Sequence, residues 1–475
     1  MPLILPGNVG SATAATGYQV DNSCRFDDGS SAYMHRTPSA GNRRTMTLSV
    51  WIKGSSLADG SNNVLGQYNS SNENNAMLLV IEGAGKIMVW NYTTDAYTMD
   101  IRTNRLLRDN SAWYHIVVAV DTTQATASNR VKVYVNGVQE TSFAVASYPS
   151  ENLELFLNQN VAQNIGTQRF GSTVSAPFDG YMAEFCFIDG TQNAVTDFGE
   201  FDEDSGIWKP INVSGLTFGT NGYYLDFEDS SALGNDVSGN DNDFTTVNLA
   251  AIDQSTDTCT NNFCTMNALD NFYAASTLSE GNLKVLTISG NAAYNPATFG
   301  LTKGKWYWEV KLVTCSAGDD SEATIFGISN QSPVNAGYDG SIQIGDGFGL
   351  RGNGNIWSSG GTEYGWNTVA VGNIVSVAVD FDNGKFYTAT NGTYGNSSNP
   401  STASNGYSFT VGTDAWFPGV NQRETSQTGT FELNFGSPSY AISSGNTDGD
   451  GYGNFEYAVP SGYYSLNTKN LSEYG

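Results

Sequence analysis

Short stretches of the chain alternate between apolar and polar residues with a period of two. One face of residues 45–52 is apolar, and residues 303–312 repeat the pattern with two tryptophans. The apolar faces consist of Met46, Leu48, Val50 and Ile52 in the first stretch, and of Trp306, Trp308, Val310 and Leu312 in the second. Because successive side chains of a strand point to opposite faces, this period is typical of half-buried β-strands.

The same pattern predicts strands along most of the remaining chain. They are expected at 113–120, 130–138, 180–187, 222–228, 282–288, 324–330, 347–351, 372–381, 386–391, 416–420 and 431–436. In the strand at 180–187, one face is expected to carry Tyr181, Ala183, Phe185 and Phe187. Asn136-Gly137 favours a type I′ hairpin turn, since both central residues of that turn need positive φ. The sequence therefore predicts an all-β fold.

The distribution of these strands divides the chain into four parts. At roughly 150 residues per domain, 475 residues suggest two or three domains. Residues 1–17 are small and polar without periodicity, which predicts an N-terminal arm. Residues 18–190 and 276–475 are each expected to form an antiparallel, jelly-roll type β-sandwich. The polar, turn-rich residues 191–275 predict an irregular connector with short strands.

The charge of the chain excludes several classes of partner. Asp and Glu number 47 against 21 Lys and Arg, for a formal net charge of -26. This balance argues against neutralising the phosphates of a nucleic acid and against docking on an anionic membrane surface. No apolar run reaches about 18 residues, so we expect no membrane insertion. The first residues lack the basic flank of a signal peptide. We therefore expect synthesis in a cytoplasm without general secretory export.

Cysteine and histidine are too few and too scattered for familiar reactive sites. The five cysteines lack Cys-x-x-Cys spacing, so free structural thiols are expected in place of a zinc site. His115 lies inside a predicted strand and is expected to be packed or hydrogen-bonded, not to act as a base. His35 is the only other histidine. A Ser-His-Asp arrangement is therefore nearly excluded.

Two groups of carboxylates deserve comparison with glycosidases. Glu200, Asp202 and Asp204 alternate as the carboxylates of jelly-roll glucanases do. Their flanks are not an alternating apolar strand, so a solvated loop is expected. Asp226 and Glu228 share a face of a predicted strand, and nothing around them predicts a raised pKa. No catalytic residue is assigned, and we expect a protein that is not an enzyme.

A glycine-rich loop near the end of the chain has spacing that suits calcium. Asn446, Asp448 and Asp450 offer oxygen ligands in an order like the first half of an EF-hand loop, and Asn454 offers a ninth position. The twelfth position is Tyr457 in place of Glu, so a metal-free surface loop is the alternative.

Four aromatic residues lie between predicted strands in glycine-rich surroundings. These are Tyr338, Trp357, Tyr364 and Trp366. Exposed rings of this kind stack on sugars, so they are candidate ligand-binding residues. The alternative is that Trp357 and Trp366 cap the sandwich.

Four motifs in the first predicted sandwich resemble a LamG domain. They are SVWIK at 49–53, WYHIVVAVD at 113–121, VYVNG at 133–137 and FDGYMAEFCFIDG at 178–190. The resemblance covers 18–190 and implies a concanavalin A-like jelly roll. It also implies binding of glycans or proteins, often with calcium.

The second predicted sandwich resembles a SPRY domain. The motifs that carry the resemblance are GKWYWEV at 304–310, FGIS at 326–329, VSVAVDFDNGKFYTATNG at 375–392, WFPGV at 416–420 and FELNFGS at 431–437. This resemblance implies a compact β-sandwich that binds protein partners through loops at one rim. It implies no enzymatic activity.

The order of the two domains resembles virion structural proteins of marine bacteriophages. MPLIL at 1–5, TPSAGNRRT at 37–45, GYYLDFEDSSALGND at 222–236 and GYYSLNTKNL at 462–471 fit this resemblance. It implies an oligomeric tail fibre, head fibre or capsid decoration on the virion surface that adheres to a host surface glycan or receptor. An assembly protein that binds other virion proteins is the alternative, and a polysaccharide depolymerase is a third hypothesis.

Overall fold

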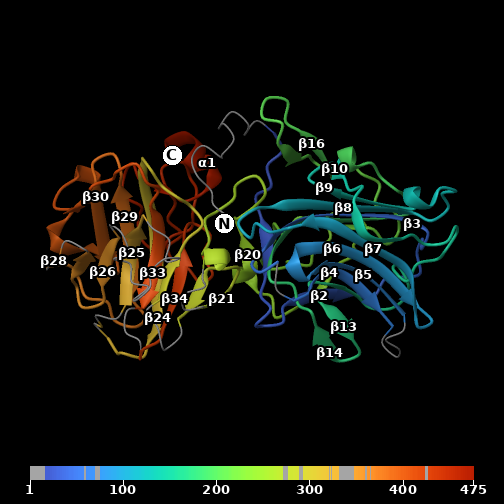
Figure 1. Cartoon of the computed structure of the whole chain (residues 1–475), viewed down its shortest axis with the longest axis horizontal. Coiled ribbons are helices and arrows are strands. Elements are labelled where there is room, and N and C mark those ends of the chain that lie inside the picture. Colours follow the sequence, from blue (N-terminus) through green and yellow to red (C-terminus); the bar gives the residue numbers. More distant parts are fainter. Residues whose placement is uncertain are drawn as a thin grey trace. The chain divides into compact units, whose positions relative to one another are not determined.

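The chain folds into two compact units, each rich in strands (Figure 1). The computed structural model describes residues 17–57, 60–69, 75–270, 276–287, 293–319, 321, 324–330, 347–358, 361–363, 365–422 and 426–475. Within these residues, 17–260 form the first unit and 261–475 the second. Among the described strands all pairs are antiparallel except β24 with β35, so the predicted all-β fold class is confirmed.

The first unit packs two eight-stranded sheets against each other. Sheet 1 has the order β10-β9-β8-β3-β15-β1-β20, and β18 also pairs with β15. Its strands are β1 (Ser23–Phe26), β3 (Thr45–Gly54), β8 (Tyr114–Asp121), β9 (Val131–Val135), β10 (Val138–Gln139), β15 (Gly180–Asp189), β18 (Tyr223–Leu225) and β20 (Gln254–Ser255). Sheet 2 has the order β11-β7-β6-β5-β4-β12-β2-β19. Its strands are β2 (Tyr33–Arg36), β4 (Asn62–Tyr68), β5 (Asn75–Glu82), β6 (Lys86–Thr93), β7 (Ala96–Leu106), β11 (Phe143–Ser147), β12 (Gln163–Ile165) and β19 (Thr245–Val247).

Smaller elements complete the first unit. Two hairpins pair β13 (Gln168–Phe170) with β14 (Thr173–Ser175) and β16 (Gly199–Phe201) with β17 (Trp208–Pro210). Short 3-10 helices lie at η3 (Gly83–Gly85), η4 (Ala127–Asn129), η5 (Val195–Asp197) and η6 (Ala251–Asp253). At the predicted type I′ turn, Asn136 and Gly137 have φ of 47° and 77°, which confirms the turn.

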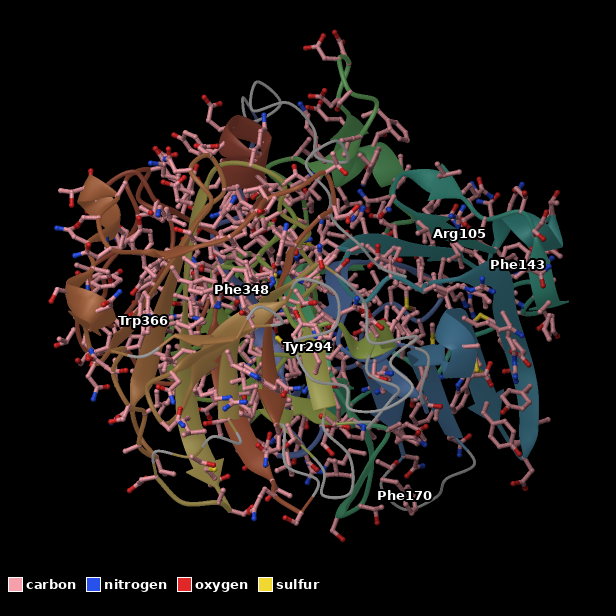
Figure 2. All side chains as sticks on the ribbon, turned by 60° about the vertical axis from the view of Figure 1, so that its left-hand side comes forward. Arg105, Phe143, Phe170, Tyr294, Phe348 and Trp366 are labelled. Carbon is pink, nitrogen blue, oxygen red and sulfur yellow. The ribbon has the colours of Figure 1, made fainter. Side chains whose placement is uncertain are left out.

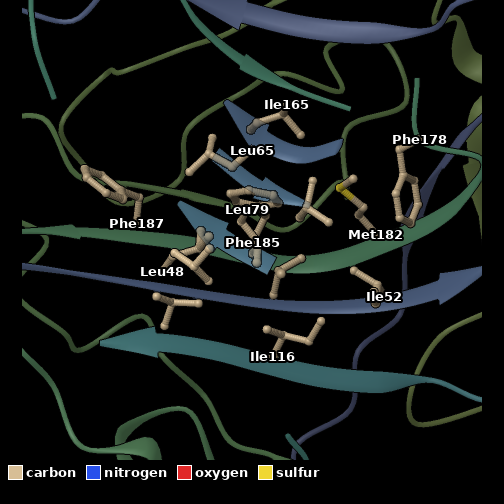
Figure 3. Close-up of a cluster of buried hydrophobic side chains, with 14 of the residues drawn as sticks. Leu48, Ile52, Leu65, Leu79, Ile116, Ile165, Phe178, Met182, Phe185 and Phe187 are labelled. Atoms are coloured by element: carbon tan, nitrogen blue, oxygen red, sulfur yellow. The ribbon is translucent and has the colours of Figure 1, made fainter. Parts of the chain in front are cut away.

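Apolar side chains from both sheets fill the space between them. Figure 3 shows Leu48, Ile52 and Ile116 of sheet 1 facing Leu65, Leu79 and Ile165 of sheet 2. The predicted apolar face of residues 45–52 lies wholly in this core. The connector was predicted at 191–275, and its residues 191–260 belong to this unit, because β18, β19 and β20 pair with β15, β2 and β1.

The prediction that Tyr181, Ala183, Phe185 and Phe187 share one face of β15 is wrong. The register with β3 shifts between Ala183 and Cys186, which marks a β-bulge, and Glu184 has a φ of 50°. A bulge adds one residue to a strand and reverses the alternation beyond it. Tyr181 and Ala183 therefore lie in an apolar cluster on the outer face, whereas Phe185 and Phe187 lie in the core.

The second unit is also built from two large sheets. Sheet 3 has the order β21-β22-β34-β24-β29-β30-β31, with β32 beside β30 and β35 beside β24. Its strands are β21 (Thr277–Ser279), β22 (Lys284–Leu286), β24 (Lys305–Cys315), β29 (Ile374–Asp380), β30 (Lys385–Thr390), β31 (Thr393–Tyr394), β32 (Tyr407–Ser408), β34 (Gly429–Asn434) and β35 (Tyr464–Ser465). Sheet 4 has the order β23-β33-β25-β26-β27-β28. Its strands are β23 (Ala293–Pro296), β25 (Thr324–Ser329), β26 (Phe348–Arg351), β27 (Ile356–Ser358), β28 (Gly361–Glu363) and β33 (Phe417–Gln422).

Helical turns are few among the described residues of the second unit. There they are η7 (Ala268–Asp270), η9 (Gly395–Ser397), η10 (Pro400–Thr402) and α1 (Thr468–Tyr474). No helix in the described part of the chain is long and apolar enough to cross a membrane.

The strand β24 is buried on both faces, not on one as predicted. Trp306, Trp308, Val310 and Leu312 lie in the core between the sheets, as expected. On the other face, Tyr307 and Glu309 are also fully buried, because C-terminal residues cover them. The ring of Phe455 packs edge-on against Tyr307 at 5.0 Å, and the carboxylate of Glu309 accepts the backbone N–H groups of Glu456 and Tyr457.

Candidate functional site

His115 lies buried between two tryptophans with both ring nitrogens hydrogen-bonded. Its Nδ1 accepts the indole N–H of Trp208 at 2.9 Å, and its Nε2 lies 2.8 Å from Ser49 Oγ. Because an indole N–H can only donate, the proton of the neutral imidazole is on Nε2 and is directed at Ser49. Burial lowers the pKa of His115 to about 3. His115 therefore cannot take a proton from Ser49, and the predicted packed imidazole is confirmed.

Glu200 and Asp202 lie at the β16–β17 hairpin beside a lysine. Lys209 Nζ lies 3.4 Å from Glu200 Oε1 and 3.1 Å from Asp202 Oδ2. Hydrogen bonds from Ser205 and Lys209 lower the pKa of Asp202 to about 2. A general acid of a glycosidase needs a raised pKa, so Asp202 is unsuited to that role.

A carboxylate that the sequence did not single out is the most perturbed one in the first unit's described part. Glu184 lies on the β15 bulge, and the hydroxyl of Tyr224 donates to its carboxylate, 2.8 Å from each oxygen. Burial raises the pKa of Glu184 to about 8. The pKa of Asp226 is raised by burial and that of Glu228 by Asp226, so the prediction of ordinary values for these two is wrong.

The predicted calcium loop is held together by its own hydrogen bonds. The oxygens of Asp448 accept the N–H groups of Asp450, Tyr452 and Ser465, the hydroxyl of Ser465 and the amide of Asn470. A carboxylate offers about four lone-pair positions, so these five donors occupy them. This buried carboxylate does not fit a calcium ligand.

The remaining predicted ligands of that loop also serve the fold. Asn446 uses its side-chain amide to donate to Ser444 Oγ, Phe455 O and Glu456 O. Asp450 Oδ2 accepts the hydroxyl of Tyr474, and the carbonyl of Asn454 accepts from Asn434. The loop therefore anchors the C-terminal segment.

Another group of carboxylates in the described chain fits a cation better. Asp27, Asp28 and Asp179 each place a carboxylate oxygen within 4.8 Å of the others. Burial and the neighbouring Asp27 raise the pKa of Asp28. Oxygen ligands crowded in this way are what Ca²⁺ prefers, because the cation offsets their mutual repulsion. The sequence signal was available as Phe26-Asp27-Asp28 and Phe178-Asp179, but the two motifs are far apart in the chain.

Two of the four residues of the predicted aromatic platform, Trp357 and Trp366, lie in the described part of the second unit. Trp366 lies in the core and is 5% exposed, and Figure 2 shows it among the strands of this unit. Trp357 is half-buried on β27, with the guanidinium of Arg351 over its ring at 4.0 Å. Tyr338 and Tyr364 lie outside the described residues. Trp366 is therefore a core residue that is closed to a ligand.

An aromatic row instead lies on the outer face of sheet 2. It consists of Tyr68, Trp90, Tyr92 and Tyr97 on β4, β6 and β7. Trp90 packs edge-on against Tyr68, Tyr92 and Tyr97, with ring centroids 6.2, 6.4 and 5.7 Å apart. Tyr97 is 51% exposed, so this row reaches solvent.

The local sequence explains why these rings share one face. Ile87 and Val89 of β6 point into the core, so Trp90 and Tyr92, which occupy the alternate positions of the strand, both point outward. More specifically, Leu78 and Trp90 are cross-strand partners, as are Tyr92 and Tyr97. Thr94 and Asp95 form the tight connection, with φ of 52° and 63°. The signal in the sequence was a strand with apolar residues on both faces followed directly by a hairpin turn.

Comparisons with known proteins agree with this architecture. Residues 27–194 match the family model of the concanavalin A-like lectin/glucanases superfamily. A search of curated proteins found no match. The family match, together with the two-sheet core, supports a concanavalin A-like first unit.

Solved structures with a similar fold share little sequence with the chain. The SPRY domain of human HERC1 is 17% identical, with 33% of this chain and 91% of that domain covered and a TM-score of 0.27. The SAP-like pentraxin of Limulus polyphemus is 12% identical, with 37% and 78% covered and a TM-score of 0.28. Domain 4 of the Geobacillus stearothermophilus arabinanase AbnA, solved with arabinotriose, is 22% identical, with 34% and 67% covered and a TM-score of 0.26. Such low values transfer no function.

Proposed function

We propose that the first unit binds a glycan on the outer face of sheet 2 and does not cleave it. The observation that carries the proposal is the aromatic row, with Tyr97 51% exposed and Trp90 half-buried at its centre. Flat aromatic rings stack on the apolar faces of sugars and are costly to leave in water. The match of residues 27–194 to a superfamily of lectins and glucanases is consistent with this role.

Three observations support binding without catalysis. The proton of His115 points at Ser49, so these two residues cannot form a nucleophile and base. Asp202 has a lowered pKa and pairs with Lys209. Glu184 has the raised pKa of a general acid, but it is buried and both of its oxygens are engaged by Tyr224. A depolymerase would need an acid of that kind in contact with the glycan.

The proposal is tested by removing one exposed ring from the row. Tyr97→Ala is expected to weaken binding to polysaccharides on a printed array about three- to tenfold, since one stacking contact is lost. The matched control is Phe201→Ala, because Phe201 is 50% exposed in the same unit but lies on the β16–β17 hairpin. Equal affinities of Tyr97→Ala and the parent chain would overturn the proposal.

We further propose that the chain is a surface appendage of a bacteriophage particle, made in the host cytoplasm. It would be a tail fibre, a head fibre or a capsid decoration that adheres to the host. Support comes from the motifs at 1–5, 37–45, 222–236 and 462–471, which resemble marine phage virion proteins. The chain is expected to be a homo-oligomer in the particle.

A second candidate function is binding to other virion proteins. Val138, Phe201 and Ile207 are each at least 50% exposed. They lie near Trp208, whose ring pairs with Phe201 at 4.9 Å and packs on the backbone of Gly137. Exposed apolar residues that gather in one place mark protein contacts. Failure to bind any glycan, together with Phe201-dependent binding to a capsid or tail protein, would favour this function.

A further inference from the structure

Beside the aromatic row, sheet 2 carries a polar cluster on the same outer face. Asn164 of β12 pairs across the sheet with Gly66 of β4 on one side and His35 of β2 on the other. Gly66 also pairs with Leu78, which in turn pairs with Trp90. Cross-strand partners share a face. One row across the sheet therefore leads from the aromatic ring of Trp90 to Asn164 and His35.

Two carboxamide oxygens in this cluster are buried without a hydrogen-bond partner among the described residues. Asn63 and Asn164 are 0% and 1% exposed, and the Oδ1 atom of each lacks a donor. A side chain at Gly66 would meet the Asn63 amide, so Asn63 lies over Gly66 beside Asn164. Native proteins rarely leave such atoms unsatisfied. Ordered water ordinarily satisfies buried acceptors of this kind, so Asn63 and Asn164 form a polar layer beneath the outer face.

An arginine with no ionic partner in the described chain stands at this cluster. Arg169 lies on the β13–β14 hairpin. The side-chain amide of Asn63 donates a hydrogen bond to the carbonyl of Thr167, the residue directly before this hairpin. The guanidinium of Arg169 lies 5.8 Å from the centre of the Tyr33 ring, and Tyr33 in turn packs against His35. Figure 2 shows the neighbouring Phe170 on the same hairpin.

This arginine differs from most others of the first unit. Six of them pair with a carboxylate, and these are Arg25, Arg43, Arg44, Arg102, Arg105 and Arg130. Arg169 makes no hydrogen bond or ion pair with any described residue, although 47 acidic residues are available in the chain. Burial and Arg169 lower the pKa of His35, so the imidazole favours its neutral form, and the guanidinium of Arg169 supplies positive charge here.

We propose that Arg169, with His35, Asn63 and Asn164, forms a subsite for an anionic group of the glycan that stacks on the aromatic row. The inference rests on the proposed glycan-binding function and specifies its ligand as an acidic polysaccharide. The guanidinium binds the carboxylate or sulfate, and the neutral imidazole exchanges hydrogen bonds with neighbouring hydroxyls.

Three polysaccharides test the subsite on the full-length chain: alginate, which carries carboxylates, dextran sulfate, which carries sulfates, and uncharged dextran. Arg169→Gln is expected to weaken binding of the acidic polymers about tenfold or more, because a charge-assisted hydrogen bond is lost. Binding should also weaken as salt rises. Lys132→Gln is the charge-matched control, since Lys132 lies on β9 in the other sheet. Both variants should keep the parent melting temperature.

The outcomes separate the subsite from the function on which it rests. Loss of alginate binding alone in Arg169→Gln assigns a carboxylate, and loss of dextran sulfate binding alone assigns a sulfate. Binding that Tyr97→Ala weakens but Arg169→Gln leaves unchanged overturns the subsite and keeps the glycan site. Tighter binding of the parent chain to uncharged dextran than to either acidic polymer also overturns the subsite and keeps the glycan site. Absence of binding to all three polymers overturns both.

Discussion

Glu184 combines two costs at a single residue. A φ of 50° is unfavourable for a side chain other than glycine, and burial of a carboxylate without a cation is unfavourable as well. The hydroxyl of Tyr224, which itself lies 3.1 Å from the hydroxyl of Tyr18, gives Glu184 its described hydrogen bonds. Burial, together with the nearby Asp226 and Glu228, keeps this carboxyl protonated at pH values well above its ordinary pKa of 4.5.

This protonation predicts a pH-dependent stability. The folded pKa of Glu184 is about 8, above its ordinary value of 4.5. The folded state binds the proton more tightly than the unfolded state does. The stabilisation from this protonation is therefore fully present below the ordinary pKa of 4.5 and is lost as pH rises through the folded pKa. Glu184→Gln does not titrate at this position, so it does not lose this stabilisation. Between about pH 5 and about pH 9, the free energy of unfolding of the parent should therefore fall relative to that of Glu184→Gln by a few kcal/mol, at roughly 1.4 kcal/mol per pKa unit.

Calorimetric melting of both chains at the two pH values measures this difference. Hydrogen exchange of the β15 amides assigns it to the first unit, since the two units need not melt together. Melting temperatures that differ equally at both pH values would show that Glu184 is ionised in the folded state.

At the scale of single residues, the sequence predicted what depends on local pattern. The packed state of His115 followed from its place inside an apolar strand. The raised pKa of Glu184 did not follow, because it depends on a bulge and on Tyr224, which lies 40 residues away in the chain. The burial of Asp448 was missed for a similar reason, since its donors Ser465 and Asn470 come from the C-terminal segment.

At the scale of elements, strand pairing brings distant acidic residues together. β1 and β15 are antiparallel, with Phe26 opposite Gly180. The residues that follow β1, Asp27 and Asp28, therefore meet Asp179, which precedes β15. Such a cluster at the end of two paired strands is a place where calcium would hold the sheet edge.

Calcium binding at Asp27, Asp28 and Asp179 would make the stability of the first unit depend on the metal. Millimolar calcium is expected to raise the melting temperature of the first unit by a few degrees, because a ligand of the folded state stabilises it by mass action. Asp28→Asn should remove most of this rise, since Asp28 is exposed and contributes one carboxylate. Asp450→Asn is the control from the loop predicted by spacing. If the calcium-dependent rise in melting temperature is lost in Asp450→Asn and kept in Asp28→Asn, calcium binds to the loop at 446–454 and not to Asp27, Asp28 and Asp179.

The elements were predicted more fully than the sites they carry. The strands at 45–52, 324–330 and 372–381 follow from alternation alone, and the structure has β3, β25 and β29 there. The aromatic row was missed because no strand was predicted between residues 53 and 112, where β4, β6 and β7 lie. Only cross-strand pairing places Tyr97 beside Tyr92. Pairing between strands is not encoded in the period of one strand.

At the scale of the whole molecule, the first sandwich extends beyond the part that matches the superfamily. The match ends at residue 194, yet β18, β19 and β20 come later and pair with β15, β2 and β1. Residues after 194 also contribute Tyr223, Leu225, Phe227, Leu233 and Phe244 to the core. Each of these buried side chains contributes about 1.5–3 kcal/mol. Their combined loss is comparable with the whole stability of a domain, about 5–15 kcal/mol.

These magnitudes predict where the chain can be divided. A fragment of residues 17–260 is expected to fold, whereas a fragment of residues 17–194 is expected to lack cooperative melting and to be digested quickly by protease. The apolar clusters around Trp51 and Val117 on the outer face of sheet 1 give a second reason, because Trp208, Phe218 and Tyr224 complete them. Calorimetry and limited proteolysis of the two fragments decide the matter. Cooperative melting of 17–194 would mean that residues 195–260 cover a finished sandwich, and the buried state of Glu184 would then depend on a removable layer.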